Sequence, residues 1–126
     1  MKNPICWFEI YVEDLPRAKA FYETMLAISL GTQPPPSDDM QMEMATFPGD
    51  FESYGTSGAL VLMPDMKPGV GGSVVYFSCE DCAVEESRVA AAGGRVIQSK
   101  MSIGEYGFCT MVSDTEGNTI GLHSMR

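Results

Sequence analysis

The sequence is short of basic side chains, of histidine and of long apolar runs. Eight lysines and arginines stand against 17 aspartates and glutamates in 126 residues, which gives a formal net charge of −9. Such a surface repels phosphate backbones and anionic lipid headgroups, so we expect neither a nucleic-acid nor a membrane partner. No apolar segment approaches the length of a transmembrane span, and the N-terminal residues lack the pattern of a signal peptide. These absences predict a cytoplasmic protein.

Disulfide crosslinks are also not expected. Of the four cysteines, three lie in strand-like runs and nothing else in the sequence is typical of secretion, which favours reduced thiols. Cys79 and Cys82 form a CxxC pattern at the start of a predicted helix, where a lowered thiol pKa would allow redox or zinc chemistry. The acidic residues between them oppose thiolate formation, and Cys79 also fits as the last core residue of a strand. A structural role is favoured, and redox chemistry is the alternative.

An internal repeat organises the chain. The segment WFEIYVEDLPRAKAFYETML, residues 7–26, returns in weaker form as VVYFSCEDCAVEESRVAAA, residues 74–92. In the first copy, apolar residues alternate as in a two-faced strand, and Asp14 then suits the N-terminal cap of a helix. In the second copy Asp81 takes the same place before an alanine-rich helix that we expect to end at Gly93 and Gly94.

Both copies continue into further predicted strands, so each half reads as a βαβββ module. The modules span about 4–63 and 73–125, and a segment rich in proline and glycine, residues 64–72, links them. The chain has the length of one domain, so neither half should fold alone. The fold class is therefore α+β. Further strands are expected at 28–33, 40–44, 59–63, 95–100, 108–113 and 119–124, with a turn at 114–118 and helix two at 82–92.

This organisation resembles the vicinal oxygen chelate superfamily, which includes glyoxalase I, bleomycin-resistance proteins and extradiol dioxygenases. The segments EDLPRAKAFYETML and DTEGNTIGLHS carry the resemblance, which covers essentially the whole chain. Together with IGEYGF, the second segment is similar to an uncharacterised glyoxalase-related branch. The resemblance implies two sheets paired into an open, curved mixed sheet or barrel, a concave face that holds the site, and a homodimer.

The chemistry of this superfamily depends on a divalent metal held by four side chains, usually His or Gln and Glu. By the resemblance, three of these positions are Trp7, Val74 and Gly121, and the fourth lies in the strand 58–63, which contains no His, Glu, Gln or Asp. Indole, alkyl groups and hydrogen do not coordinate such cations. We therefore expect no metal and no other cofactor, and a metal held by Glu9 and His123 is the alternative.

Strand alternation predicts which side chains share the concave face. We expect Glu9 and His123, the chain's only histidine, to face each other in an aromatic-walled cavity and to act as a catalytic acid and base pair. The alternative is that His123 is a structural or surface residue. Alternating methionines at 40–44 predict sheet packing, or else one wall of a pliable apolar pocket. The residues expected to bind a ligand are Trp7, Tyr11, Tyr76, Glu105 and Tyr106, the last two either as a mobile lip or within an ordinary hairpin connection.

Two function classes follow. The first is a binding protein of the bleomycin-resistance type, which holds a small, partly apolar molecule in a metal-free concave pocket. The second is a glyoxalase-type lyase or isomerase, similar to lactoylglutathione lyase, which uses Glu9 and His123. A third reading is an interaction module in which Trp7 fills the pocket. The sequence leaves open whether the protein is an enzyme.

Overall fold

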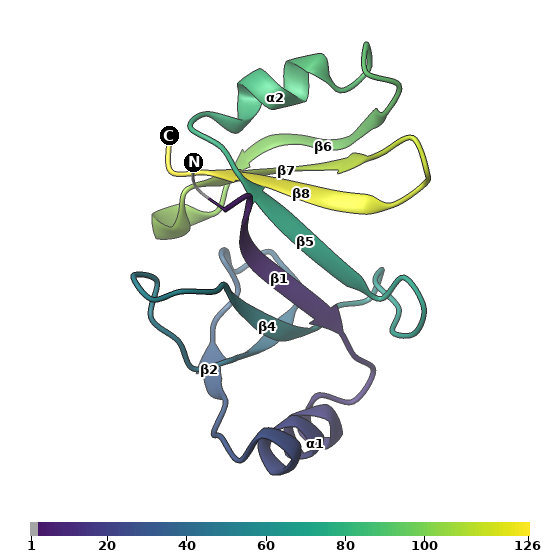
Figure 1. Ribbon diagram of the computed structural model, residues 1–126. Coiled ribbons are helices and arrows are strands. Elements are labelled where there is room, and N and C mark those ends of the chain that lie inside the picture. The colour runs from purple at the N-terminus through teal and green to yellow at the C-terminus, as the bar shows by residue number, and fades with distance from the viewer. Residues whose placement is uncertain (1–2) are drawn as a thin grey trace. The chain divides into compact units, whose positions relative to one another are not determined.

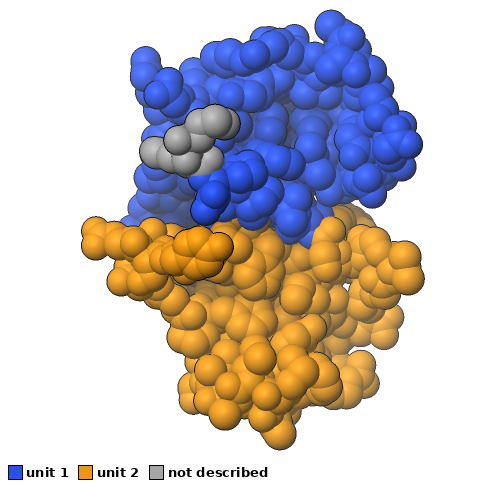
Figure 2. All heavy atoms as spheres, viewed as in Figure 1, with its two compact units in different colours: residues 1–6, 74–126 blue, residues 7–73 orange. Residues whose placement is uncertain are grey.

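The computed structural model describes residues 3–126, which form two compact units. One unit comprises residues 7–73, and the other comprises residues 74–126 together with the N-terminal residues up to Cys6 (Figure 2). The chain follows the order βαβββ twice (Figure 1). The predicted α+β class is confirmed. The elements are β1 (Ile5–Tyr11), α1 (Leu15–Leu26), β2 (Gly31–Gln33), β3 (Glu43–Thr46), β4 (Ser57–Leu62), β5 (Ser73–Ser78), α2 (Cys82–Arg88), β6 (Arg95–Ser102), β7 (Phe108–Ser113) and β8 (Thr119–Ser124).

In the unit of residues 7–73 the strands lie in the order β2-β3-β4-β1. β1 runs parallel to β4, whereas β2, β3 and β4 are antiparallel neighbours. One face of this sheet packs against α1 through a core centred on Val12, Leu30, Ala45 and Leu60. Because strand side chains alternate between faces, Trp7, Glu9 and Tyr11 of β1 point to the face away from α1.

Helix α1 begins and ends at positions with clear local causes. The side chain of Asp14 accepts a hydrogen bond from the amide of Arg17 at 3.0 Å, and Pro16 lies in the first turn, where no intrahelical donor is lost. The helix ends at Ala27, which has φ 54° and ψ 49° and is the only non-glycine residue with positive φ among residues 3–126. An alanine in the left-handed region carries a steric cost that a glycine would avoid.

The second unit repeats this arrangement with the strand order β5-β8-β7-β6. β5 and β8 are parallel, and β6, β7 and β8 are antiparallel. Helix α2 covers one face over a core centred on Cys82, Val112 and Leu122, and Figure 1 shows it running alongside β6. The Asp81 side chain caps α2 by accepting from the amide of Ala83 at 3.0 Å, as the repeat predicts.

Several predicted boundaries are wrong. The strand expected at 40–44 begins only at Glu43, because the amide of Met40 bonds back to the carbonyl of Ser37 in a turn. Helix two ends at Arg88, and residues 89–94 continue as hydrogen-bonded turns. Strand β6 extends to Ser102, and residues 104–106 form a short 3-10 helix. Among residues 3–126 no helix has the length and apolar character required to cross a membrane.

Candidate functional site

A cluster of three side chains on β1 surrounds a buried carboxylate. Glu9 is only 8% exposed, and its two oxygens accept hydrogen bonds from different neighbours. The indole Nε1 of Trp7 donates to Oε2 at 3.1 Å, and the hydroxyl of Tyr11 donates to Oε1 at 2.7 Å. A buried carboxylate is costly unless it is hydrogen-bonded, so these two aromatic residues stabilise Glu9 in place.

The strand beside this cluster presents small and apolar side chains. In the parallel register Glu9 lies opposite Ala59, and Tyr11 lies opposite Val61, both of which are fully buried. On the next strand Met44 pairs with Val61 and is 5% exposed. The carboxylate of Glu9 therefore lies within an apolar layer.

In the second unit an aromatic ring covers a glycine. Tyr76 of β5 pairs with Gly121 of β8, and a Cβ added at Gly121 would overlap the ring of Tyr76. The tyrosine thus fills the space that a side chain at position 121 would need. Ser78 and His123 form the next pair but one along the same strands, so His123 shares the face of Tyr76.

The histidine has a defined structural contact. Its Nε2 lies 2.6 Å from the carbonyl oxygen of Tyr106, which can only accept, so Nε2 carries the proton and donates. This bond ties β8 to the short helix Gly104–Tyr106. Glu105 and Tyr106 are both exposed there, Tyr106 at 40%. The segment is a turn closed on His123, and its predicted role as a mobile lip remains a prediction.

The predicted site residues therefore fall into two groups. Trp7, Glu9 and Tyr11 are joined by hydrogen bonds in the unit of residues 7–73, whereas Tyr76, Glu105, Tyr106 and His123 belong to the other unit. Pairing of Glu9 with His123 as acid and base stays a prediction. Sequence reasoning missed that Trp7 and Tyr11 both donate to Glu9, although residues two apart on a strand share a face and the spacing carries that signal.

The CxxC pair does not have the features of a reactive dithiol. Burial, together with the nearby Glu85 carboxylate, raises the pKa of the Cys79 thiol to about 11. Cys82, the first residue of α2, is fully buried in the core of its unit. Within residues 3–126 the cysteines form no disulfide. A protonated thiol is a poor nucleophile and a poor ligand, so the structure favours a packing role for both residues.

The side chains at the family's metal positions do not fit a divalent cation. Trp7 offers only an N–H donor, which is engaged with Glu9, while Val74 is a buried alkyl group and Gly121 lies beneath the Tyr76 ring. No group of three or more His, Cys, Asp or Glu side chains within residues 3–126 could hold a metal ion. This donor set therefore does not match the chemistry of the family's metal site.

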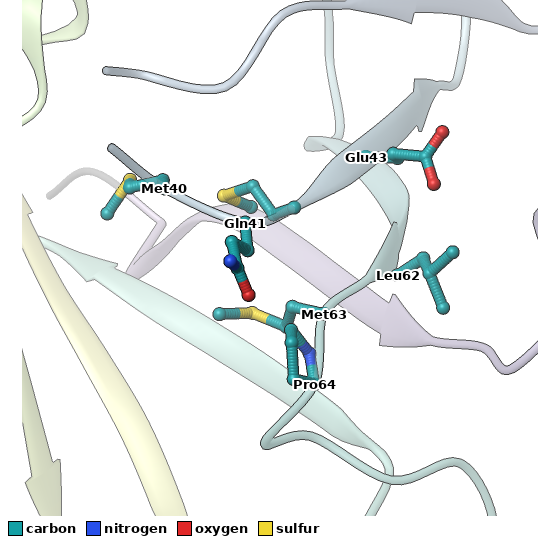
Figure 3. A pocket seen from close by; sticks show the side chains of 7 residues that line it. Met40, Gln41, Glu43, Leu62, Met63 and Pro64 are labelled. Atoms are coloured by element: carbon teal, nitrogen blue, oxygen red, sulfur yellow. The ribbon is translucent and has the colours of Figure 1, made fainter. Parts of the chain in front are cut away.

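Two hollows lie at one end of the sheet in the unit of residues 7–73. The first, of about 400 Å³, is lined by residues 40–43 and 62–64 and includes three methionines (Figure 3). The second, of about 480 Å³, lies between the start of α1, strand β2 and the proline-rich segment after it. They share Met42, Glu43 and Leu62. Met44 is buried but also lines the second hollow, whereas Met40 and Met42 are half-buried and border the first.

With this geometry established, comparison with known proteins identifies the family. The chain belongs to the Glyoxalase/Bleomycin resistance protein/Dioxygenase superfamily, whose model matches residues 5–122. This match confirms the resemblance to the vicinal oxygen chelate superfamily.

Among curated proteins, the chain is 24% identical over 121 residues to the "Putative glyoxylase CFP32" of Mycobacterium bovis and to that of Mycobacterium tuberculosis. The match covers 92% of this chain and 43% of those proteins, so the chain spans less than half the length of the curated relatives it matches. The activity of the whole relatives is therefore not carried over directly.

Solved structures agree on the fold. Methylmalonyl-CoA epimerase from Mycobacterium tuberculosis matches with a TM-score of 0.69 and 16% identity, covering 98% of this chain and 88% of that chain. The hypothetical protein BH1468 from Bacillus halodurans matches with a TM-score of 0.73 and 12% identity, covering 100% of this chain and 96% of that chain. At these identities the likeness establishes the fold alone.

Proposed function

We propose that this protein binds a small, partly apolar molecule without a metal ion, at the face of β1 that carries Trp7, Glu9 and Tyr11. One observation carries the proposal. At the position where the family holds its first metal ligand, Trp7 instead donates its indole N–H to the buried carboxylate of Glu9. The site thus has an aromatic wall and a fixed carboxylate where a metalloenzyme of this family has a coordination sphere.

The surrounding side chains define the ligand class. Ala59 and Val61 are fully buried beside Glu9, so the partly exposed indole ring of Trp7 is the apolar surface that a ring or alkyl body would cover. The chain's net charge of −9 opposes the approach of polyanions. We therefore expect a neutral or positively charged molecule with an apolar body. In the other unit, Tyr76, Glu105 and Tyr106 are separate candidate ligand contacts.

Trp7 makes the proposal directly measurable, because it is the chain's only tryptophan. Its emission should change saturably when a ligand enters the site. We would screen small molecules by tryptophan fluorescence, with and without EDTA and then with added Zn²⁺, Ni²⁺ or Mg²⁺. Binding that is unaffected by chelation supports the proposal. Binding that requires a stoichiometric divalent metal would overturn it.

Matched variants locate the signal. Trp7→Phe should abolish the fluorescence response but keep much of the affinity measured by calorimetry, whereas Glu9→Gln should weaken binding of ligands that carry an N–H or a positive charge. Tyr54→Phe is the control, since Tyr54 is 98% exposed in a turn outside the β1 face. A native mass spectrum of tag-free protein would reveal the mass of any ligand retained through purification. The same spectrum would test the predicted homodimer.

A second candidate function is glyoxalase-type lyase or isomerase chemistry. The observation that favours it is the burial of Glu9 with a hydrogen bond to each oxygen, which orients a carboxylate as a catalytic base requires. The predicted acid is His123, and because Nε2 already donates to Tyr106, it can give a proton from Nδ1 only as an imidazolium. Turnover that disappears in both Glu9→Gln and His123→Ala, with binding retained, would support this function over sequestration.

A further inference from the structure

Three methionines line the open hollow where β3 begins and β4 ends. The hollow is bordered by residues 40–43, which lead into β3, and by residues 62–64, which leave β4. Met40, Met42 and Met63 are each half-buried, whereas Met44, the next methionine along β3, is only 5% exposed. The first three thioethers are therefore accessible from solvent, although they lie at the edge of a packed sheet.

The strand register brings two of these methionines to adjacent positions just beyond the last pair of the β3–β4 ladder. Glu43 pairs with Leu62 at the end of the antiparallel β3–β4 ladder, so Met42 and Met63 are the next residues on the two chains. Met40 follows two residues beyond Met42. Figure 3 shows Met40 and Met63 on one side of the strands and Glu43 with Leu62 on the other.

The chemistry of this lining is that of a soft ligand set. A thioether is uncharged at every pH and binds soft cations, whereas Mg²⁺ and Ca²⁺ prefer oxygen ligands. No lysine, arginine or histidine lines the hollow, and the chain's net charge of −9 attracts cations. Thiols also bind soft cations, so any Ag⁺ taken up by the cysteines has to be counted apart from the thioether site, although Cys82 and Cys109 are buried.

We propose that Met40, Met42 and Met63 form a binding site for a soft monovalent cation, Cu⁺ or Ag⁺. The site uses none of the residues Trp7, Glu9 and Tyr11 on β1. This proposal is therefore independent of the proposed small-molecule function. No electron or group is transferred in this step. The cation exchanges coordinated water for thioether sulfur, and the flexible methionine side chains close around it.

Silver titration of the full chain, with the methionine methyl groups labelled with carbon-13, tests the proposal. Ag⁺ is diamagnetic and needs no reductant, and the methyl signals report on thioethers and not on thiols. We expect the methyl signals of Met40, Met42 and Met63 to shift together and saturate at one Ag⁺ beyond any bound by thiols. Each signal is assigned by its loss in the corresponding Met→Leu variant. Mg²⁺ should leave all ten methionine signals in place.

The variants also measure the contribution of each ligand. Met42→Leu and Met63→Leu conserve volume and should keep the fold, and each should weaken Ag⁺ binding by about tenfold or more. Met125→Leu is the matched control, because Met125 is 66% exposed near the C-terminus and should leave affinity unchanged. Two results would overturn the proposal. In the first, the methyl shifts of Met40, Met42 and Met63 do not saturate as Ag⁺ is added. In the second, the methyl signal of Met125 shifts by as much as theirs.

Discussion

The imidazole Nε2 of His123 donates a hydrogen bond to the carbonyl oxygen of Tyr106, 2.6 Å away. This contact fastens the short helix of residues 104–106 to β8. The turn is closed further by the amide of Gly107, which bonds to the carbonyl of Gly104, and by the amide of Ile103, which bonds to the carbonyl of Gly107. The chain's only histidine therefore has a structural role, whether or not it also takes part in catalysis.

Removing this contact should loosen the turn without unfolding the sheet. His123→Ala should lower the free energy of unfolding by about 0.5–1.5 kcal/mol, the usual net value of one hydrogen bond. Amide hydrogen exchange of Ile103 and Gly107 should accelerate, while exchange at Gly117, in a different turn, should not change. His123→Gln, whose side-chain amide can donate to the same carbonyl, should restore part of the protection. Equal exchange in the wild type and in His123→Ala would show that the imidazole does not hold the turn.

The end of α1 offers a stabilising substitution. Ala27 is exposed and has φ 54°, a left-handed conformation in which a Cβ costs about 1–2 kcal/mol. Ala27→Gly should therefore raise the melting temperature. Ala20→Gly, at an exposed position inside the same helix, should instead destabilise the protein by about 1 kcal/mol because glycine loses more backbone freedom there. The opposite signs of the two changes are the test, and a loss of stability in both variants would contradict it.

The thiol of Cys79 should be slow to react. Burial and the Glu85 carboxylate raise its pKa from 9.0 to about 11, so at pH 8 the thiolate fraction falls by about a hundredfold. Alkylation by iodoacetamide, followed by mass spectrometry, measures this rate against an unstructured cysteine peptide. Glu85→Gln should raise the rate modestly, since burial is the larger cause. Rapid modification of Cys79 in the native protein would refute the prediction.

The same shift predicts a dependence of stability on pH. The folded state binds the Cys79 proton more tightly than the unfolded chain, so this contribution to stability is complete below pH 9. It is lost as the pH rises from 9.0 towards about 11. Cys79→Ala should flatten the stability profile in this window, and denaturant unfolding at several pH values measures the slope. An identical slope in the variant and in the wild type would contradict the assignment.

Position 121 should not accept a side chain. A methyl group there would overlap the ring of Tyr76, so Gly121→Ala should cost about 1–3 kcal/mol, as overpacking usually does. The cost should shrink when Tyr76 is first replaced by leucine. A double-mutant cycle on unfolding free energies measures this coupling. Additive effects would mean that the ring does not determine the cost.

The parts of the fold that were correctly predicted depend on interactions close in sequence. Asp14 and Asp81 cap their helices as expected, because a capping carboxylate reaches only two or three residues along the chain. The turn at 114–118 also follows the sequence, with the Asp114 carboxylate accepting from the amides of Glu116 and Asn118. In each case the residue types at fixed spacing determine the geometry.

Features that depend on partners distant in sequence were not predicted. Met63 borders the methionine hollow only because β4 pairs with β3 in one particular register. The strand expected at Met40 was wrong because a turn bond to Ser37 competes with strand pairing. The ring of Tyr76 lies over Gly121 because β5 pairs with β8 in one particular parallel register. The repeat implies that these two strands pair, but it does not determine which residues are opposite each other.

The contact between Tyr76 and Gly121 also restricts how this sequence can change over generations. A coordinating side chain at position 121 is sterically acceptable only after the residue at 76 has become smaller. A change at 121 that precedes a change at 76 would lower the stability of the fold, and Trp7, Val74 and a residue of the strand 58–63 would still have to become ligands. The aromatic residue at position 76 is therefore a steric obstacle to a coordinating side chain at 121, in addition to the changes that the other ligand positions would require.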